Sequence, residues 1–151
     1  MPTLVVVDMQ PQFSNSTCKI TRAACVREVK YAVKNNHNIV FLEFGGWGKT
    51  TSMLTDLTAD YPHAVTLLKH QMDGSEEIKQ HFEKKNKRPK KFHVCGVNGD
   101  QCVYETIRGM KRHFPKSKII AVLDAINASC SKDSQRHLLS KLVPVVNADA
   151  A

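Results

Sequence analysis

Short apolar runs alternate along the chain with longer segments in which apolar residues recur at helical spacing. The apolar runs are rich in β-branched residues, as expected for strands of a parallel sheet that is covered on both faces. They predict five strands and a short final strand, at residues 4–7, 39–42, 64–68, 92–95, 119–123 and 143–146.

The segments between these runs predict helices. Thr21 and Ser75 are residue types that cap helix N-termini, and the segment 51–60 predicts a short helix. The most regular stripe begins at Cys102 and ends near His113, with its apolar side chains on one face. Strands that alternate with helices predict a doubly wound, Rossmann-like α/β/α sandwich of three layers with a mostly parallel sheet. We expect one domain over residues 1–151, because no linker, repeat or low-complexity tract interrupts the pattern.

Composition limits where the protein can work. No apolar stretch is long enough to cross a bilayer, and the N-terminus lacks the charged region of a signal peptide. The five cysteines are an odd number and include no CxxC pair, which favours reduced thiols. We therefore expect a cytoplasmic protein with no membrane partner.

The formal net charge is +8, and much of it comes from the basic segment 84–91. One interpretation is a solvated helix end, where lysines complement the helix dipole. The other is a surface for nucleic acid or an acidic partner. The segment contains no aromatic residue that could stack on bases, so we favour the first interpretation and expect no nucleic-acid partner.

Three residues capable of catalysis follow predicted strands: Asp8, Lys69 and Cys102. The carboxyl ends of parallel strands share one edge of the sheet, so these side chains can converge there. A helix N-terminus at Cys102 favours the thiolate, and a carboxylate beside the thiol can take its proton. Each residue taken alone also has an ordinary explanation: a packed cysteine, a capping aspartate and a solvated lysine, with His70 as an alternative cation.

The motifs around these residues resemble those of the isochorismatase-like cysteine hydrolases, which include nicotinamidases, carbamoylsarcosine amidohydrolases and isochorismatases. Residues 4–13 (LVVVDMQPQF) resemble the opening strand of that family, residues 67–69 its lysine strand, and residues 96–103 (GVNGDQCV) its nucleophile turn. The motifs occur in the family's order, and the predicted elements match its layout from Thr3 to about Val146.

The resemblance implies a catalytic triad of Asp8, Lys69 and Cys102. Cys102 would be the nucleophile, Asp8 the general base and then acid, and Lys69 the cation that orients and polarises the pair. It also implies a cis peptide bond between Val97 and Asn98. The backbone N–H groups of Asn98 and Cys102 would form the oxyanion hole.

Two departures from the family pattern concern the pocket. Gly99 stands where the family usually has threonine or serine, and residues 43–50 lack the histidine of the nicotinamidase metal motif. We therefore expect no metal and no organic cofactor, with Phe13 and Trp47 lining the substrate pocket. Family members commonly self-associate, so the resemblance implies a homo-oligomer.

The predicted function is hydrolysis of a small-molecule amide or related C–N bond through a covalent Cys102 intermediate. Two alternatives stay open at this point. One is an ether hydrolase of the isochorismatase type. The other is a noncatalytic binding protein on the same scaffold that uses the basic segment 84–91.

Overall fold

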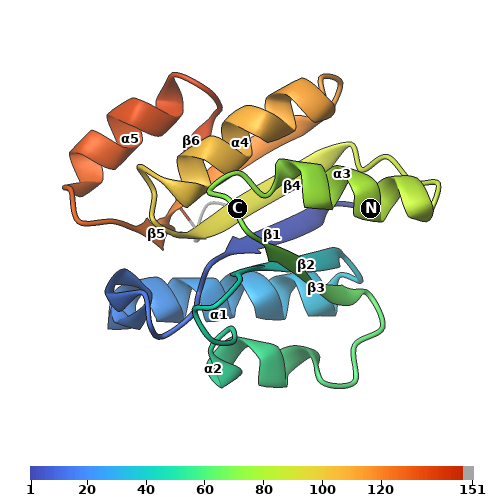
Figure 1. Cartoon of the computed structure of the whole chain (residues 1–151), viewed down its shortest axis with the longest axis horizontal. Coiled ribbons are helices and arrows are strands. Elements are labelled where there is room, and N and C mark those ends of the chain that lie inside the picture. The colour runs from blue at the N-terminus through green and yellow to red at the C-terminus, as the bar shows by residue number, and fades with distance from the viewer. Residues whose placement is uncertain (148–151) are drawn as a thin grey trace.

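The structure is a computed structural model that describes residues 1–147 (Figure 1); the last residues of the predicted domain, 148–151, lie outside the described part. Six strands form one sheet in the order β3-β2-β1-β4-β5-β6, and every neighbouring pair is parallel. The strands are β1 (Thr3–Val7), β2 (Asn38–Phe44), β3 (Ala64–Lys69), β4 (Lys91–Val97), β5 (Lys118–Asn127) and β6 (Val145–Val146).

Helices cover both faces of the sheet, with α1 and α2 on one side and α3, α4 and α5 on the other (Figure 1). The α-helices are α1 (Lys19–Lys34), α2 (Ser52–Thr55), α3 (Ser75–Lys84), α4 (Cys102–His113) and α5 (Lys132–Ser140), with 3-10 turns at Ser14–Thr17 and Asp56–Thr58. The structure therefore confirms the predicted fold class, and its sheet is entirely parallel in the described residues.

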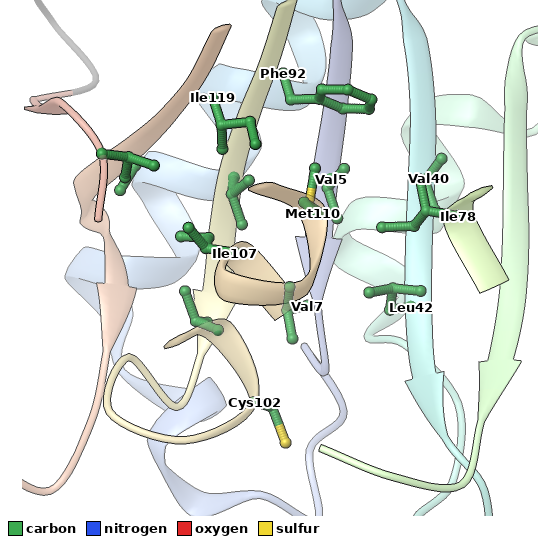
Figure 2. Packing of buried hydrophobic residues seen from close by; sticks show 14 of the residues in the cluster. Val5, Val7, Val40, Leu42, Ile78, Phe92, Cys102, Ile107, Met110 and Ile119 are labelled. Carbon is green, nitrogen blue, oxygen red and sulfur yellow. The ribbon is translucent and has the colours of Figure 1, made fainter. Parts of the chain in front are cut away.

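Each face of the sheet has its own hydrophobic core. All five residues of β1 are buried, and their side chains alternate between the two cores. Val5 and Val7 pack beneath α4 with Ile107 and Met110, as Figure 2 shows. Leu4 and Val6 pack on the opposite face. The continuous apolar runs in the sequence thus mark strands that are buried on both sides.

The strand order reverses between β1 and β4, and this is where ligand sites form in doubly wound sheets. The two strands approach closely here because Gly96, with φ of 117°, pairs with Val7. A Cβ atom at Gly96 would lie 2.0 Å from the carbonyl oxygen of Val7. Only glycine fits that approach, which places the chain segments that follow β1 and β4 side by side.

The structure corrects two predicted helix starts. The first helix begins at Lys19 with Cys18 as its N-cap, instead of being capped by Thr21. The third begins at Ser75 itself, with Gly74 as N-cap. Both predictions placed the N-cap at a residue type that is common there. The backbone conformation decides which residue is the N-cap, and residue type alone does not give it. The helix at Cys102 begins and ends where the sequence predicts.

Candidate active site

Asp8 lies directly after β1, at the carboxyl edge of the sheet. Its backbone has a φ of 51°, in the left-handed region that few residues other than glycine occupy. Its N–H donates to the carbonyl of Leu42 at 3.0 Å. The residue is only 1% exposed. A carboxylate held in a sparsely populated backbone conformation and buried in this way is typical of a functional position.

Lys69 ends β3 and reaches Asp8 from the other side. Its Nζ lies 3.1 Å from Asp8 Oδ2, and both side chains are almost completely buried. Nζ also donates to the carbonyl of Gln71 at 2.9 Å and lies 4.2 Å from the centre of the Phe44 ring. A buried pair of this kind interacts far more strongly than a surface pair, because little water screens it.

Cys102 is the first residue of α4 and lies at the rim of the core beneath that helix. Its sulfur is directed away from the packed apolar side chains, as Figure 2 shows. The residue is 7% exposed. Burial, and after it the neighbouring Asp8 carboxylate, raise the pKa of the Cys102 thiol to about 12, although Lys69 acts in the opposite direction. The resting group is therefore a thiol, which differs from the thiolate that the helix N-terminus predicted.

The pKa of the Asp8 carboxyl is also shifted by burial and by its two neighbours. Burial raises the pKa of the Asp8 carboxyl above its ordinary value, while the Lys69 ammonium and the Cys102 thiol lower it. Its second oxygen, Oδ1, is buried and has no hydrogen-bond partner among residues 1–147. A raised pKa makes this carboxylate a stronger base than an exposed aspartate, and the unpaired oxygen leaves it able to accept a proton.

The turn before α4 contains a cis peptide bond between Val97 and Asn98. The carbonyl of Asn98 accepts from the N–H groups of Gln101 and Val103, and its side-chain oxygen accepts from Asn15 at 2.6 Å. Within the described residues the backbone N–H groups of Asn98 and Cys102 have no acceptor. Both predicted oxyanion donors are thus uncommitted in the structure.

Phe13 and Trp47 lie together at the same edge of the sheet. Their rings stack with centroids 4.8 Å apart, and Phe13 also meets Phe44 edge to face at 6.3 Å. Phe44 was not predicted, and it connects this aromatic group to Lys69. Trp47 is 44% exposed, so the group runs from solvent to the buried cation.

Two buried polar residues that sequence reasoning missed hold the loops around this centre. Gln10 is fully buried; its amide donates to the carbonyls of Phe44 and Gly48, and its oxygen accepts from the N–H of Phe44. Thr106 lies one helical turn after Cys102, accepts from the N–H of Gly74 and donates to the carbonyl of Met72. A polar residue three positions after the end of a buried strand could have indicated Gln10.

Gly99 departs from the family pattern for a steric reason. A Cβ atom at this position would lie 2.8 Å from Gln135 Oε1 and 2.8 Å from Ile126 Cγ2. Gln135 is buried, its amide donates to the carbonyl of Cys130, and its Oε1 has no partner in the described residues. The side chain from α5 therefore fills the space that a larger residue at position 99 would occupy.

Other features of the described part of the chain bear on cofactors and membranes. Among residues 1–147 no three His, Cys, Asp or Glu side chains are grouped so that they could hold a metal ion. None of the described helices combines the length and apolar character needed to cross a membrane. The five cysteines form no disulfide.

Comparison with known proteins gives likeness of structure alone. No protein-family model and no curated protein sequence matches the chain. The structure superposes on MAR1 ribonuclease from Caenorhabditis elegans with a TM-score of 0.85 and 17% identity, covering 99% of this chain and 78% of that one.

Two amidohydrolases are also similar in structure. N-carbamoylsarcosine amidase from Thermoplasma acidophilum has a TM-score of 0.80 and 16% identity, with 98% of this chain and 96% of that one covered. The nicotinamidase/pyrazinamidase PncA from Bacillus subtilis has a TM-score of 0.80 and 13% identity, with 97% and 99% covered. The chain thus has the α/β fold of the isochorismatase-like hydrolases, as the sequence motifs predicted.

Proposed function

We propose that this protein is a cysteine hydrolase that cleaves a small amide or a related C–N bond. The observation that supports this most directly is the buried 3.1 Å contact between Lys69 and Asp8, together with the mutual pKa effects of Asp8 and Cys102. Three residues from distant parts of the sequence meet at the switch point of the sheet, where such sites form. The amidohydrolases among the similar structures favour C–N cleavage.

The proposed reaction begins with a neutral thiol. Asp8 takes the proton of Cys102 as the sulfur attacks the carbonyl carbon of the substrate, because a free thiolate is unfavourable at this buried position. The tetrahedral oxyanion would accept hydrogen bonds from the N–H groups of Asn98 and Cys102. Asp8 then gives the proton to the leaving nitrogen, and the C–N bond breaks to leave a thioester.

Water completes the cycle. It attacks the thioester carbon and gives a proton to Asp8, and the second tetrahedral intermediate collapses with release of the acid and return of the proton to Cys102. Lys69, with its Nζ 3.1 Å from Asp8 Oδ2, stabilises the negative charge on Asp8. The Phe13, Phe44 and Trp47 rings would contact the apolar part of the substrate. The chemistry requires no cofactor, and we expect a homo-oligomer.

Trapping the intermediate tests this proposal. The protein is incubated with a panel of small amides, quenched in acid, and the peptide that contains Cys102 is weighed by mass spectrometry. We expect an acyl adduct on Cys102 and loss of turnover in Cys102→Ala. Cys130→Ala, which alters a half-buried thiol two residues outside α5, serves as the matched control. Turnover that persists in Cys102→Ala would remove the nucleophile assignment.

Testing amides and vinyl ethers separately distinguishes the amide hydrolase from the two alternatives, an ether hydrolase and a noncatalytic binding protein. Release of a hydroxyl compound from a vinyl ether, with no turnover of any amide, would favour the ether hydrolase. An inert Cys102 and no turnover of either class would favour the noncatalytic binding protein.

A further inference from the structure

The positive charge of this protein is concentrated at the edge of the sheet opposite the candidate active site. Two basic turns lie there. One is segment 84–91, from the last residue of α3 to the first of β4, and the other is segment 116–118, in the connection from α4 to the first residue of β5; in Figure 1 the first lies at the right and the second at the upper right. Together they carry eight Lys and Arg residues and no Asp or Glu: Lys84, Lys85, Lys87, Arg88, Lys90, Lys91, Lys116 and Lys118.

These eight cations equal the whole net charge of the chain. The other 14 Lys and Arg residues match the 14 Asp and Glu residues in number. The rest of the chain therefore carries no net formal charge, and we name these eight residues the basic surface. All eight are exposed. None forms an ion pair with a carboxylate of residues 1–147.

The fold fixes the two turns side by side. Lys91 and Lys118 are partners in the register of β4 and β5, and the N–H of Lys118 donates to the carbonyl of Lys90 at 2.8 Å. Ser117 Oγ donates to the carbonyl of Pro89 at 2.6 Å. Mutual repulsion would separate eight mobile cations, but here hydrogen bonds between the turns hold their backbones together. The sequence alone revealed only one of the two turns.

The basic surface also contains two hollows. A hollow of about 260 Å³ lies between the turns, with Arg88, Lys90 and Lys116 among its lining residues and Phe114 and two prolines beside them. A second hollow of about 280 Å³ lies on the other side of Arg88 and includes Lys87. Anionic groups can therefore approach these cations from two adjacent concavities.

We propose that the basic surface binds the phosphate backbone of double-stranded nucleic acid. Paired turns that carry several cations and no carboxylates match a polyanion with regularly spaced charges. Segments 84–91 and 116–118 contain no aromatic residue, and Phe114, which precedes the second segment in the same connection, is only 8% exposed and packs on Phe92, so base stacking on a single strand is not favoured. Of the large exposed hydrophobic side chains in the described residues, none lies in these turns, although Met1 lines the second hollow and Tyr31 lines a pocket that includes Lys91. Two separate side chains offer too little apolar surface to favour insertion into a lipid surface.

The experiment measures binding of a labelled 20-base-pair RNA duplex by fluorescence anisotropy at 50 to 200 mM KCl. Contact with about four phosphates predicts that affinity falls roughly 10²-fold over this range, with no dependence on sequence. The double variant Arg88→Gln/Lys118→Gln should bind about tenfold more weakly, with a salt slope smaller by about two. The variant Lys19→Gln/Lys49→Gln removes the same charge from exposed sites at the opposite edge and should bind like the wild type.

Three results would overturn the proposal. They are equal weakening by the two double variants, tighter binding to the single strand than to the duplex, and binding to anionic vesicles without binding to the duplex. The proposal does not rest on the hydrolase assignment. Cys102→Ala should bind the duplex as the wild type does, so failure of one proposal is distinguishable from failure of the other.

Discussion

The two edges of the sheet use charge in opposite ways. At the carboxyl edge a single ion pair, Lys69 with Asp8, is buried and changes the proton affinity of the neighbouring thiol. At the amino edge eight cations are exposed, and none forms an ion pair with a carboxylate of the described residues. Burial makes each charge at the first edge strong and specific, whereas the second edge gains strength only from number.

Replacing the Asp8 carboxylate gives the largest expected effect. Asp8→Asn removes the proposed general base, so turnover should fall by about 10²–10⁴-fold. The same change removes a negative charge that raises the pKa of the Cys102 thiol from its position beside it. The thiol pKa should therefore fall below about 12, and alkylation of Cys102 by iodoacetamide at pH 8 should become faster while catalysis is lost.

Peptide mass spectrometry distinguishes Cys102 from the four other thiols in this experiment. Asp100→Asn, an exposed change in the same turn, is the control and should alter neither rate. Slower alkylation in Asp8→Asn would contradict the arrangement, because it would mean that Asp8 assists ionisation of the resting thiol.

The wild-type pH profile follows from the same carboxyl. Asp8 acts as a base only when ionised, and burial raises its pKa. Activity should therefore increase with pH through a value above that of an ordinary aspartate, seen in the acid limb of kcat/KM. An acid limb at or below the ordinary value would show that another group is the base.

The sequence predicted the fold and the three residues of the candidate site. It could not predict the protonation state of Cys102 or the contacts made by the loops, and the physical reasons differ. The apolar runs made the six-stranded pattern recognisable, because strands of a parallel sheet that is covered on both faces are rich in apolar residues. The fold then brings Asp8 and Lys69 together, although 61 positions separate them. The protonation state of Cys102 was not accessible, because the helix dipole is a local property whereas burial depends on the packed fold. Phe44 and Thr106 were missed because their roles depend on loop contacts.

Removing the cation of the buried pair should destabilise the fold. Lys69→Met leaves the Asp8 carboxylate buried without its partner, which typically costs about 3–5 kcal/mol. The pKa of Asp8 should rise further, because Lys69 is the main influence that lowers it. Below the new pKa the carboxyl is neutral, so the loss of stability should be larger at pH 8 than at pH 5.

Urea unfolding at the two pH values measures this difference. Lys49→Met, an exposed substitution at the same edge, should change the free energy of unfolding by less than about 0.5 kcal/mol. An equal loss for Lys69→Met at both pH values would indicate lost packing of the lysine stem in place of an unpaired carboxylate.

The turn before Cys102 offers a smaller and more local test. Gly99→Ala places a Cβ atom against Gln135 and Ile126, and overpacking of this kind costs about 1–3 kcal/mol. Gln135→Ala removes one of the two contacts and should relieve part of that loss in the double variant. Unfolding free energies of the four members of this cycle measure the coupling. Simple additivity would show that Gln135 does not restrict position 99.

The smallest expected effect is that of a charge change at the amino edge on catalysis at the carboxyl edge. A five-residue strand such as β1 separates them by about 17 Å, which is roughly twice the Debye length of about 8 Å at 0.15 M salt. Arg88→Gln/Lys118→Gln should therefore leave kcat/KM for a small substrate within twofold at that ionic strength. At 0.01 M the Debye length grows to about 30 Å, so the variant should then lower kcat/KM for an anionic substrate but not for a neutral one. A large effect on the neutral substrate at high salt would mean that the amino edge affects the catalytic centre through the fold, and the two regions could no longer be treated as separate.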